Sequence, residues 1–259
     1  MSPPENTIRT KTDGNILIVT IDRTQARNAV DGATATALYE AFKAFDADDT
    51  LSVAILTGAD GNFCAGADLK AVAIGKGNPS HTEGDLGPMG PSRLQLSKPV
   101  IAAVDGYAVA GGLELAIWCD LRVASPSAKF GVFCRRFGVP LIDGGTVRLP
   151  RLIGASRAMD LILTGREVSA EEAHTIGLVN YLTSDETALP YALKIARDIA
   201  AFPQLCMKAD RASALSQWSL SEEDAIRAEF AGGLNVLKAG SAKEGASRFS
   251  KGEGRHGKF

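Results

Sequence analysis

The sequence predicts an α/β fold that continues into a helical C-terminal region. Short apolar segments rich in β-branched residues, which favour strands, alternate with segments that carry apolar residues at helical spacing. The expected strands are apolar on both faces, which is typical of a largely parallel sheet covered by helices on both sides. Beyond residue 155 the helical segments dominate, so the two ends of the chain are expected to differ in architecture.

The first half of the chain contains a clear helix between two strands. Residues 31–45 place Leu38, Phe42 and Phe45 at helical spacing. The expected strands are residues 16–21, 52–57, 100–104 and 121–124.

The C-terminal part is expected to be mostly helical. The expected helices are residues 156–163, 170–176, 189–201, 205–215 and 222–237, and a strand-like run at 178–181 interrupts them. We therefore divide the chain into a core domain, residues 1–190, and a helical C-terminal region, residues 191–259. Residues 75–91 are rich in Gly and Pro and predict a long loop, which is either a functional lid or a surface insertion.

Composition and charge argue against several classes of protein. A chain with 45% hydrophobic residues and a net charge of −2 is typical of a globular protein with no bulk attraction for nucleic acid or an anionic membrane. The cysteines form no C-x-x-C pair and the histidines are scattered, so no metal site is expected. Because we find neither a signal-peptide pattern nor an apolar run of the ~20 residues that span a bilayer, we expect a cytoplasmic protein.

The segment 63–69, Phe-Cys-Ala-Gly-Ala-Asp-Leu, follows an expected strand and has small residues where the chain turns toward a helix. Backbone N–H groups at such a turn have no acceptor within the helix, and the helix dipole adds positive potential there. Such a turn can stabilise developing negative charge. Taken alone, the segment is also compatible with an ordinary strand-to-helix turn.

A second segment, residues 105–115, also follows an apolar strand. Gly111 and Gly112 allow a ligand to approach the backbone closely, and Glu114 lies in the first turn of the following helix. A carboxylate among apolar neighbours has its charged form disfavoured, which suits acid–base chemistry, although the helix dipole alone also favours Glu there. The spacing from Gly106 to Gly111 is that of a phosphate-binding loop, but the Lys and the Ser or Thr of that motif are missing.

Together the two segments resemble the enoyl-CoA hydratase/isomerase family, also called the crotonase superfamily. The resemblance is carried by residues 27–29, 63–70, 98–116, 119–120, 144–146, 163–165 and 173–179, so it runs almost from end to end. It implies a crotonase-like spiral of ββα units, in which the helical C-terminal region serves oligomerisation and pocket closure. It also implies an enzyme that acts on an acyl-CoA thioester without a prosthetic group, assembled as a homotrimer or a dimer of trimers.

The resemblance also implies roles for individual residues. The backbone N–H groups of Ala67 and Gly111 match the family's oxyanion hole, which holds the thioester oxygen as it gains enolate character. Glu114 matches a catalytic glutamate. The positions that match the family's coenzyme A contacts are Gln25, Ala26, Arg27, Ala65, Asp68, Leu69 and Lys70, with Phe249 and Lys251 of a neighbouring subunit near the adenine.

The sequence departs from the family pattern at the second glutamate of the hydratases, where Cys134 stands. A thiol is a poor substitute for a carboxylate, and Cys134 is also interpretable as a small buried apolar residue. Asp143 lies nearby, at a position where the family's naphthoyl-CoA synthases also carry Asp. It either faces the pocket with Glu114 or caps the helix that begins at Gly144.

Three cations near Asp143 complete the candidate site. Arg135, Arg136 and Arg148 could lower the pKa of Asp143 or bind a substrate carboxylate. The expected activity is that of an acyl-CoA lyase or isomerase, with hydration of a trans-2-enoyl-CoA as the family default. Double-bond isomerisation by a single glutamate and a non-catalytic acyl-CoA-binding scaffold are the alternatives.

Overall fold

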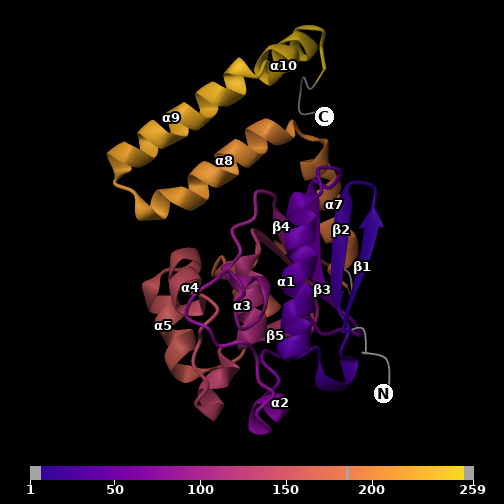
Figure 1. Ribbon diagram of the computed structural model, residues 1–259, viewed down its shortest axis with the longest axis vertical. Coiled ribbons are helices and arrows are strands. Elements are labelled where there is room, and N and C mark those ends of the chain that lie inside the picture. The colour runs from indigo at the N-terminus through magenta and orange to yellow at the C-terminus, as the bar shows by residue number, and fades with distance from the viewer. Residues whose placement is uncertain (1–6, 185–186, 254–259) are drawn as a thin grey trace. The chain divides into compact units, whose positions relative to one another are not determined.

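The computed structural model describes residues 7–184 and 187–253, and it divides the chain into two compact units, residues 1–199 and 200–259 (Figure 1). The division falls later than the predicted boundary at residue 190. Most of helix α7 (Leu189–Ala201), with Ala192 and Ala196 buried, belongs to the first unit.

Within the described residues, the first unit contains a six-stranded sheet with the order β1-β2-β3-β4-β6-β9. The strands are β1 (Ile8–Asp13), β2 (Ile16–Ile21), β3 (Val53–Gly58), β4 (Val100–Val104), β6 (Leu121–Ala124) and β9 (Tyr181–Leu182). Only the edge pair β1–β2 is antiparallel, and every other neighbouring pair is parallel. The four predicted strands are confirmed to within one residue, and β9 covers only the end of the predicted run at 178–181.

A smaller sheet runs beside the first and is formed, in the described part of the chain, by β5 (Tyr107–Val109), β7 (Lys129–Gly131) and β8 (Val168–Ser169). The chain passes from β4 in the large sheet to β5 in the small sheet and then into helix α3 (Gly111–Trp118). It passes in the same way from β6 to β7. This is the ββα arrangement that the resemblance implies.

Helix α1 (Gly32–Ala47) covers strands of the large sheet, beside which it lies in Figure 1. Asp31 caps its N-terminus by accepting a hydrogen bond from the Thr34 N–H at 2.9 Å. Its buried residues include Leu38, Phe42 and Phe45, as the helical spacing predicts. The remaining helices of the first unit are α2 (Leu69–Ala73), α4 (Gly145–Ile153), α5 (Ala155–Thr164) and α6 (Ala170–Thr175).

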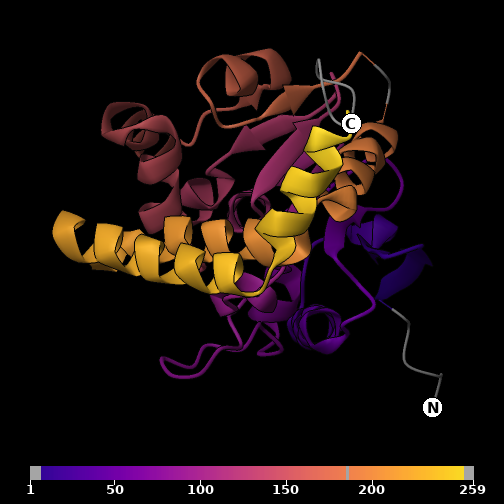
Figure 2. The same cartoon turned by 90° about the horizontal axis from the view of Figure 1, so that it is seen from above.

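The second unit consists of helices α8 (Gln204–Ser216), α9 (Glu222–Lys238) and α10 (Ser241–Ser250). Helices α8 and α9 run side by side, and α10 turns away from the end of α9 (Figure 2). The large exposed apolar side chains of this unit include Leu215, Trp218, Phe230 and Leu237. Among the described residues, no helix is both long and apolar enough to cross a membrane.

Candidate active site

The two Gly- and Ala-rich turns are bonded to each other. The Cys64 N–H donates to the Tyr107 carbonyl at 2.7 Å, and the Val109 N–H donates to the Cys64 carbonyl at 3.1 Å. A Cβ atom on Gly112 would lie 2.0 Å from the Cys64 carbonyl oxygen, so only glycine allows the backbones to approach this closely. Two segments that are more than 40 residues apart in the sequence therefore form one structure.

The N–H groups of Ala67 and Gly111 are the two donors that match the family's oxyanion hole. Among residues 7–184 and 187–253, neither group has a hydrogen-bond acceptor. Gly111 is the first residue of α3, so its N–H has no partner within the helix. A Cβ atom on Gly66, the residue before Ala67, would lie 3.1 Å from the Gly111 nitrogen. The two donors therefore belong to turns that touch.

The backbone is strained immediately before Gly111. Ala110 has φ 54° and ψ −125°, a left-handed conformation that costs a residue with a Cβ atom about 1–3 kcal/mol. The Ala110 N–H donates to the Gly131 carbonyl at 2.9 Å, which fixes this peptide against strand β7. Such strain persists only where the surrounding structure enforces it, and here it orients the peptide that carries the Gly111 N–H.

Glu114 is almost fully buried, with 2% of its surface exposed. Its Oε1 accepts hydrogen bonds from the N–H groups of Asp143, at 2.9 Å, and Gly145, at 2.8 Å. No donor to Oε2 is present in the described part of the chain. Burial raises the pKa of Glu114 to about 7, and the negative charge of Asp143 adds to this rise. Glu114 can therefore gain and lose a proton near neutral pH.

Asp143 is also buried, and its side chain turns away from the helix that follows it. Its Oδ1 accepts hydrogen bonds from the Met89 N–H, at 2.8 Å, and from the Ser92 hydroxyl. Helix α4 begins after Gly144 without a side-chain cap, so the capping interpretation of Asp143 is wrong. Burial raises the pKa of Asp143, whereas the bonds from Ser92 and Met89 oppose the rise.

Cys134 lies on a short 3₁₀ helix, η3 (Phe133–Phe137), and is buried. Burial raises the pKa of its thiol, and the negative charge of Glu114 adds to this rise. The thiol is therefore neutral at physiological pH. The Asp143 N–H bonds Glu114 directly, and the carboxyl of Asp143 is a stronger acid–base group than the thiol of Cys134.

The three candidate cations are separated by the structure. Arg135 donates to the Ile162 carbonyl at 3.1 Å, and Arg136 donates to the Gly165 carbonyl at 2.9 Å, so both are tied to the end of α5. Arg148 instead donates to the Asp143 carbonyl at 2.8 Å. Of the three, Arg148 is the one that belongs to the site.

Met89 and Ser92 belong to the site, although the sequence does not predict them. Both contact Asp143, and the side chain of Met89 lies against Gly111, where a Cβ atom would come within 2.6 Å of its sulfur. The local sequence signal is a pair of glycines, Gly87 and Gly90, at which the chain folds back. The N–H group of each glycine donates a hydrogen bond to the carbonyl of the other. Residues after the predicted loop 75–91 and at its end thus form a wall of the site.

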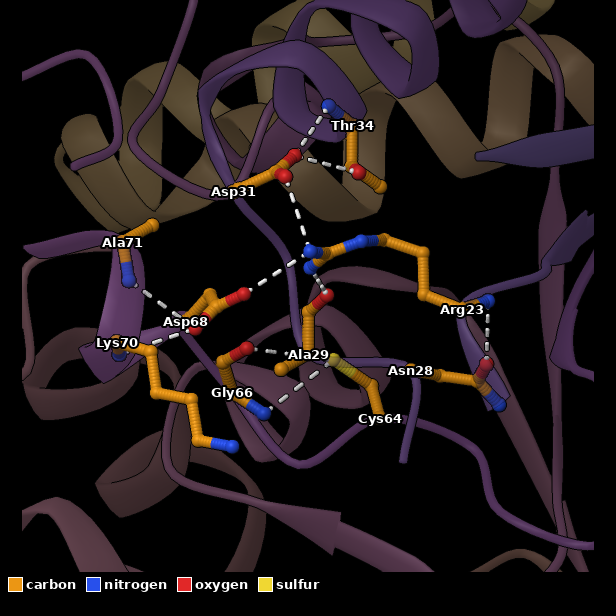
Figure 3. Close-up of polar contacts among 10 residues, drawn as sticks. All are labelled: Arg23, Asn28, Ala29, Asp31, Thr34, Cys64, Gly66, Asp68, Lys70 and Ala71. Atoms are coloured by element: carbon orange, nitrogen blue, oxygen red, sulfur yellow. Dashed lines mark hydrogen bonds and ion pairs between the residues drawn. The ribbon is translucent and has the colours of Figure 1, made fainter. Parts of the chain in front are cut away.

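Asp68, a predicted coenzyme A contact, has its carboxylate engaged in the protein (Figure 3). Its Oδ1 caps helix α2 by accepting from the N–H groups of Lys70 and Ala71, and its Oδ2 pairs with Arg23 at 2.9 Å. Arg23 also pairs with Asp31 at 3.0 Å. Asp68 therefore holds the start of α2, and its contact with coenzyme A stays a prediction.

The other predicted coenzyme A positions of the first unit lie around the same turns. The Ala65 N–H donates to the Arg27 carbonyl at 3.1 Å, which joins the segment containing Gln25 and Ala26 to the first Gly/Ala turn. The Arg27 guanidinium lies over the ring of Tyr107, 5.3 Å from its centre.

A surface depression of about 450 Å³ adjoins helix α2. Its lining includes Lys70, Lys76 and Ile74, so cationic and apolar groups share it. Leu69 is partly exposed nearby.

Phe249 and Lys251 belong to the second unit, at the end of α10. Their approach to the adenine end of coenzyme A stays a prediction. In the described part of the chain, no group of three or more His, Cys, Asp or Glu side chains is arranged to hold a metal ion.

Comparison with known proteins agrees with the geometry. The enoyl-CoA hydratase/isomerase family matches residues 11–256. The enoyl-CoA hydratase EchA19 of Mycobacterium tuberculosis is 38% identical over 242 residues, which cover 92% of this chain and 91% of the relative. A carnitinyl-CoA dehydratase of Salmonella arizonae is 37% identical over 94% of this chain and 95% of its own length.

Solved structures resemble the fold closely. The crystal structure of the enoyl-CoA hydratase EchA1 from Mycobacterium marinum has a TM-score of 0.89 and 39% identity, covering 95% of this chain and 96% of that chain. An enoyl-CoA hydratase from Bacillus anthracis has a TM-score of 0.86 and 30% identity with the same coverage. The chain belongs to the enoyl-CoA hydratase/isomerase family and has the crotonase fold.

Proposed function

We propose that this enzyme adds water across the double bond of a trans-2-enoyl-CoA thioester. The observation that carries the proposal is the position of Glu114. This buried carboxyl group, with a pKa near 7, lies one helical turn after the Gly111 N–H, which has no acceptor among the described residues. A group with such a pKa suits general acid–base catalysis at neutral pH. The names of relatives that are called enoyl-CoA hydratase support the same reaction.

In the proposed mechanism the thioester oxygen binds the N–H groups of Ala67 and Gly111. Both donors strengthen as the oxygen gains enolate charge during attack at C3, so they stabilise the transition state more than the substrate. The donors are fixed parts of the backbone and need no reorganisation during the reaction. They serve dehydration equally, because the reverse reaction passes through the same transition state.

Two carboxyl groups divide the proton transfers. The Asp143 carboxylate takes a proton from water as the water oxygen bonds to C3, and the protonated Glu114 delivers a proton to C2. Two N–H groups hold Oε1 of Glu114, so Oε2 is the oxygen that carries the transferred proton. Transfer of a proton from Asp143 back to Glu114 restores the starting state.

Coenzyme A would lie along Gln25, Ala26, Arg27, Ala65, Asp68, Leu69 and Lys70, with Phe249 and Lys251 contributed by a neighbouring subunit. A homotrimer or a dimer of trimers would cover exposed apolar side chains of the second unit, such as Trp218 and Phe230. We place the enzyme in the cytoplasm, acting on acyl-CoA without a prosthetic group.

Double-bond isomerisation is a second candidate because Cys134 replaces the second family glutamate. Its thiol is neutral, so an enzyme that relied on Glu114 alone would shuttle one proton between carbons without adding water. Comparing turnover of 2-enoyl-CoA and 3-enoyl-CoA substrates distinguishes the two reactions. A non-catalytic scaffold would bind both thioesters and turn over neither.

We expect Asp143→Asn to lower kcat for hydration of but-2-enoyl-CoA by about 100-fold or more, because it removes the base. Cys134→Ser, which replaces one small neutral group by another, is expected to keep kcat within about threefold of the wild type, because the thiol takes no proton. The loss of absorbance of the conjugated thioester measures both rates. The opposite pattern, an inactive Cys134→Ser and an active Asp143→Asn, would assign the second role to Cys134.

The pH dependence follows from the raised pKa of Glu114. Because Glu114 works as the proton donor, kcat/KM is expected to fall about tenfold per pH unit above pH 7. Burial also raises the pKa of Asp143. Below that pKa, Asp143 is protonated and cannot act as the base, so kcat/KM falls again and the pH profile is bell-shaped. A measured kcat/KM that stays constant up to pH 9 would exclude Glu114 as the acid.

A further inference from the structure

Arg148 joins the two segments that hold Asp143. On helix α4, its Nη1 donates to the Asp143 carbonyl and its Nη2 donates to the Ser92 carbonyl, each at 2.8 Å. The Ser92 hydroxyl in turn donates to the Asp143 carboxylate. One guanidinium therefore fixes both the main chain of Asp143 and the residue that orients its side chain.

The same turn holds Glu114. The N–H groups of Asp143 and Gly145 both donate to Glu114 Oε1, and the Asp143 carbonyl accepts from Arg148. A Cβ atom on Gly144, which has φ 92°, would lie 2.3 Å from the Arg148 Nη1, so the guanidinium packs directly against the turn. Any displacement of Arg148 would therefore move the turn that binds the catalytic glutamate.

Arg148 also brings positive charge to the carboxyl pair. Within residues 7–184 and 187–253 its guanidinium bonds carbonyl oxygens and forms no ion pair with a carboxylate. Its charge favours the ionised forms of Glu114 and Asp143. The other charged or titratable groups that act on these three residues are Arg93, Cys119, Cys134 and Arg151.

We propose that Arg148 is the positioning residue of the carboxyl pair: it holds the turn 143–145 in the geometry that binds Glu114, and its charge sets the pH range in which the pair works. This inference rests on the proposed function and deepens it, because it names a residue that acts on the reaction without touching the reacting atoms. The geometry supports it through both carbonyl bonds and the close packing at Gly144.

The test compares two variants. Arg148→Met removes the charge and the donors, whereas Arg148→Lys keeps the charge but cannot donate to both carbonyls with the geometry of a guanidinium. For Arg148→Met we expect kcat to fall about 10–100-fold and the alkaline limb of the pH profile to move upward by about one pH unit. For Arg148→Lys we expect kcat to fall as well, while the alkaline limb of the pH profile stays near its wild-type pH. Arg157→Met, an exposed arginine on α5, is the matched control.

A second readout needs no turnover. The titration of Glu114, followed by ¹³C NMR of carboxyl-labelled glutamate and assigned with Glu114→Gln, is expected to move upward in Arg148→Met and to stay in place in Arg157→Met. An unmoved titration in a folded Arg148→Met protein would overturn the inference, even if kcat falls. If Arg148→Met does not fold, a normal kcat in Arg148→Lys overturns the positioning role. A shifted titration in an enzyme that hydrates no enoyl-CoA would refute the proposed function and leave Arg148's role intact.

Discussion

Glu114→Gln is expected to lower kcat for enoyl-CoA hydration by about 10²–10⁴-fold, because the amide cannot donate a proton at the position of Oε2. The side chain keeps its shape, and its remaining oxygen can still accept from the N–H groups of Asp143 and Gly145. The amide also imitates the protonated carboxyl, so KM is expected to change little. Steady-state kinetics on but-2-enoyl-CoA below pH 7 measures both parameters.

The matched control is Glu40→Gln, which removes an exposed carboxylate of α1 and is expected to leave kcat unchanged. The unfolding temperature shows whether the variant is inactive because it lacks the proton donor or because it does not fold. Because the folded state raises the pKa of Glu114 from 4.5 to about 7, ionisation of Glu114 costs the folded state increasing free energy as the pH rises through this window. At pH 8, Glu114→Gln should therefore unfold at a temperature equal to or higher than the wild type. Full activity in this variant would remove Glu114 from the mechanism.

The sequence predicts the large sheet better than the small one. Strands such as Ile16–Ile21 and Val100–Val104 are long enough for their apolar run to be recognised. Strands β5, β7 and β8 have only two or three residues each, which is too short to show a period. The small sheet is formed by pairing of β5 with β7 and of β7 with β8, and such non-local contacts are not visible in local sequence patterns.

Site residues that are close together in the sequence could be predicted together, whereas those that only the fold brings together could not. Glu114 and Gly111 share one helical turn, so the motif alone places them together. The contact between Asp143 and Ser92 joins residues that are 51 positions apart, and no local pattern signals it. Likewise, only the folded chain distinguishes Arg148 from Arg135, because the three-dimensional position of α4 decides which cation reaches Asp143.

A second large effect is expected for Gly66→Ala, with kcat falling about 10²–10³-fold, as for the loss of one oxyanion donor. A Cβ atom there would lie 2.9 Å from the Ala110 Cβ and 3.1 Å from the Gly111 nitrogen. Gly66 also has φ 98°, and its N–H donates to the Cys64 sulfur at 3.4 Å (Figure 3). The added methyl group must therefore push the two turns apart.

Gly14→Ala separates the cost of the backbone conformation from the effect on the site. Gly14 also has a positive φ, 61°, but a Cβ atom there would meet no atom within 4 Å. We expect both variants to lose some thermal stability and only Gly66→Ala to lose kcat. Side-chain substitution cannot delete a backbone N–H, so displacing one turn against the other is the direct way to test whether two main-chain donors act at one point. A folded Gly66→Ala enzyme with wild-type kcat would mean that the spacing of Ala67 and Gly111 does not govern the reaction.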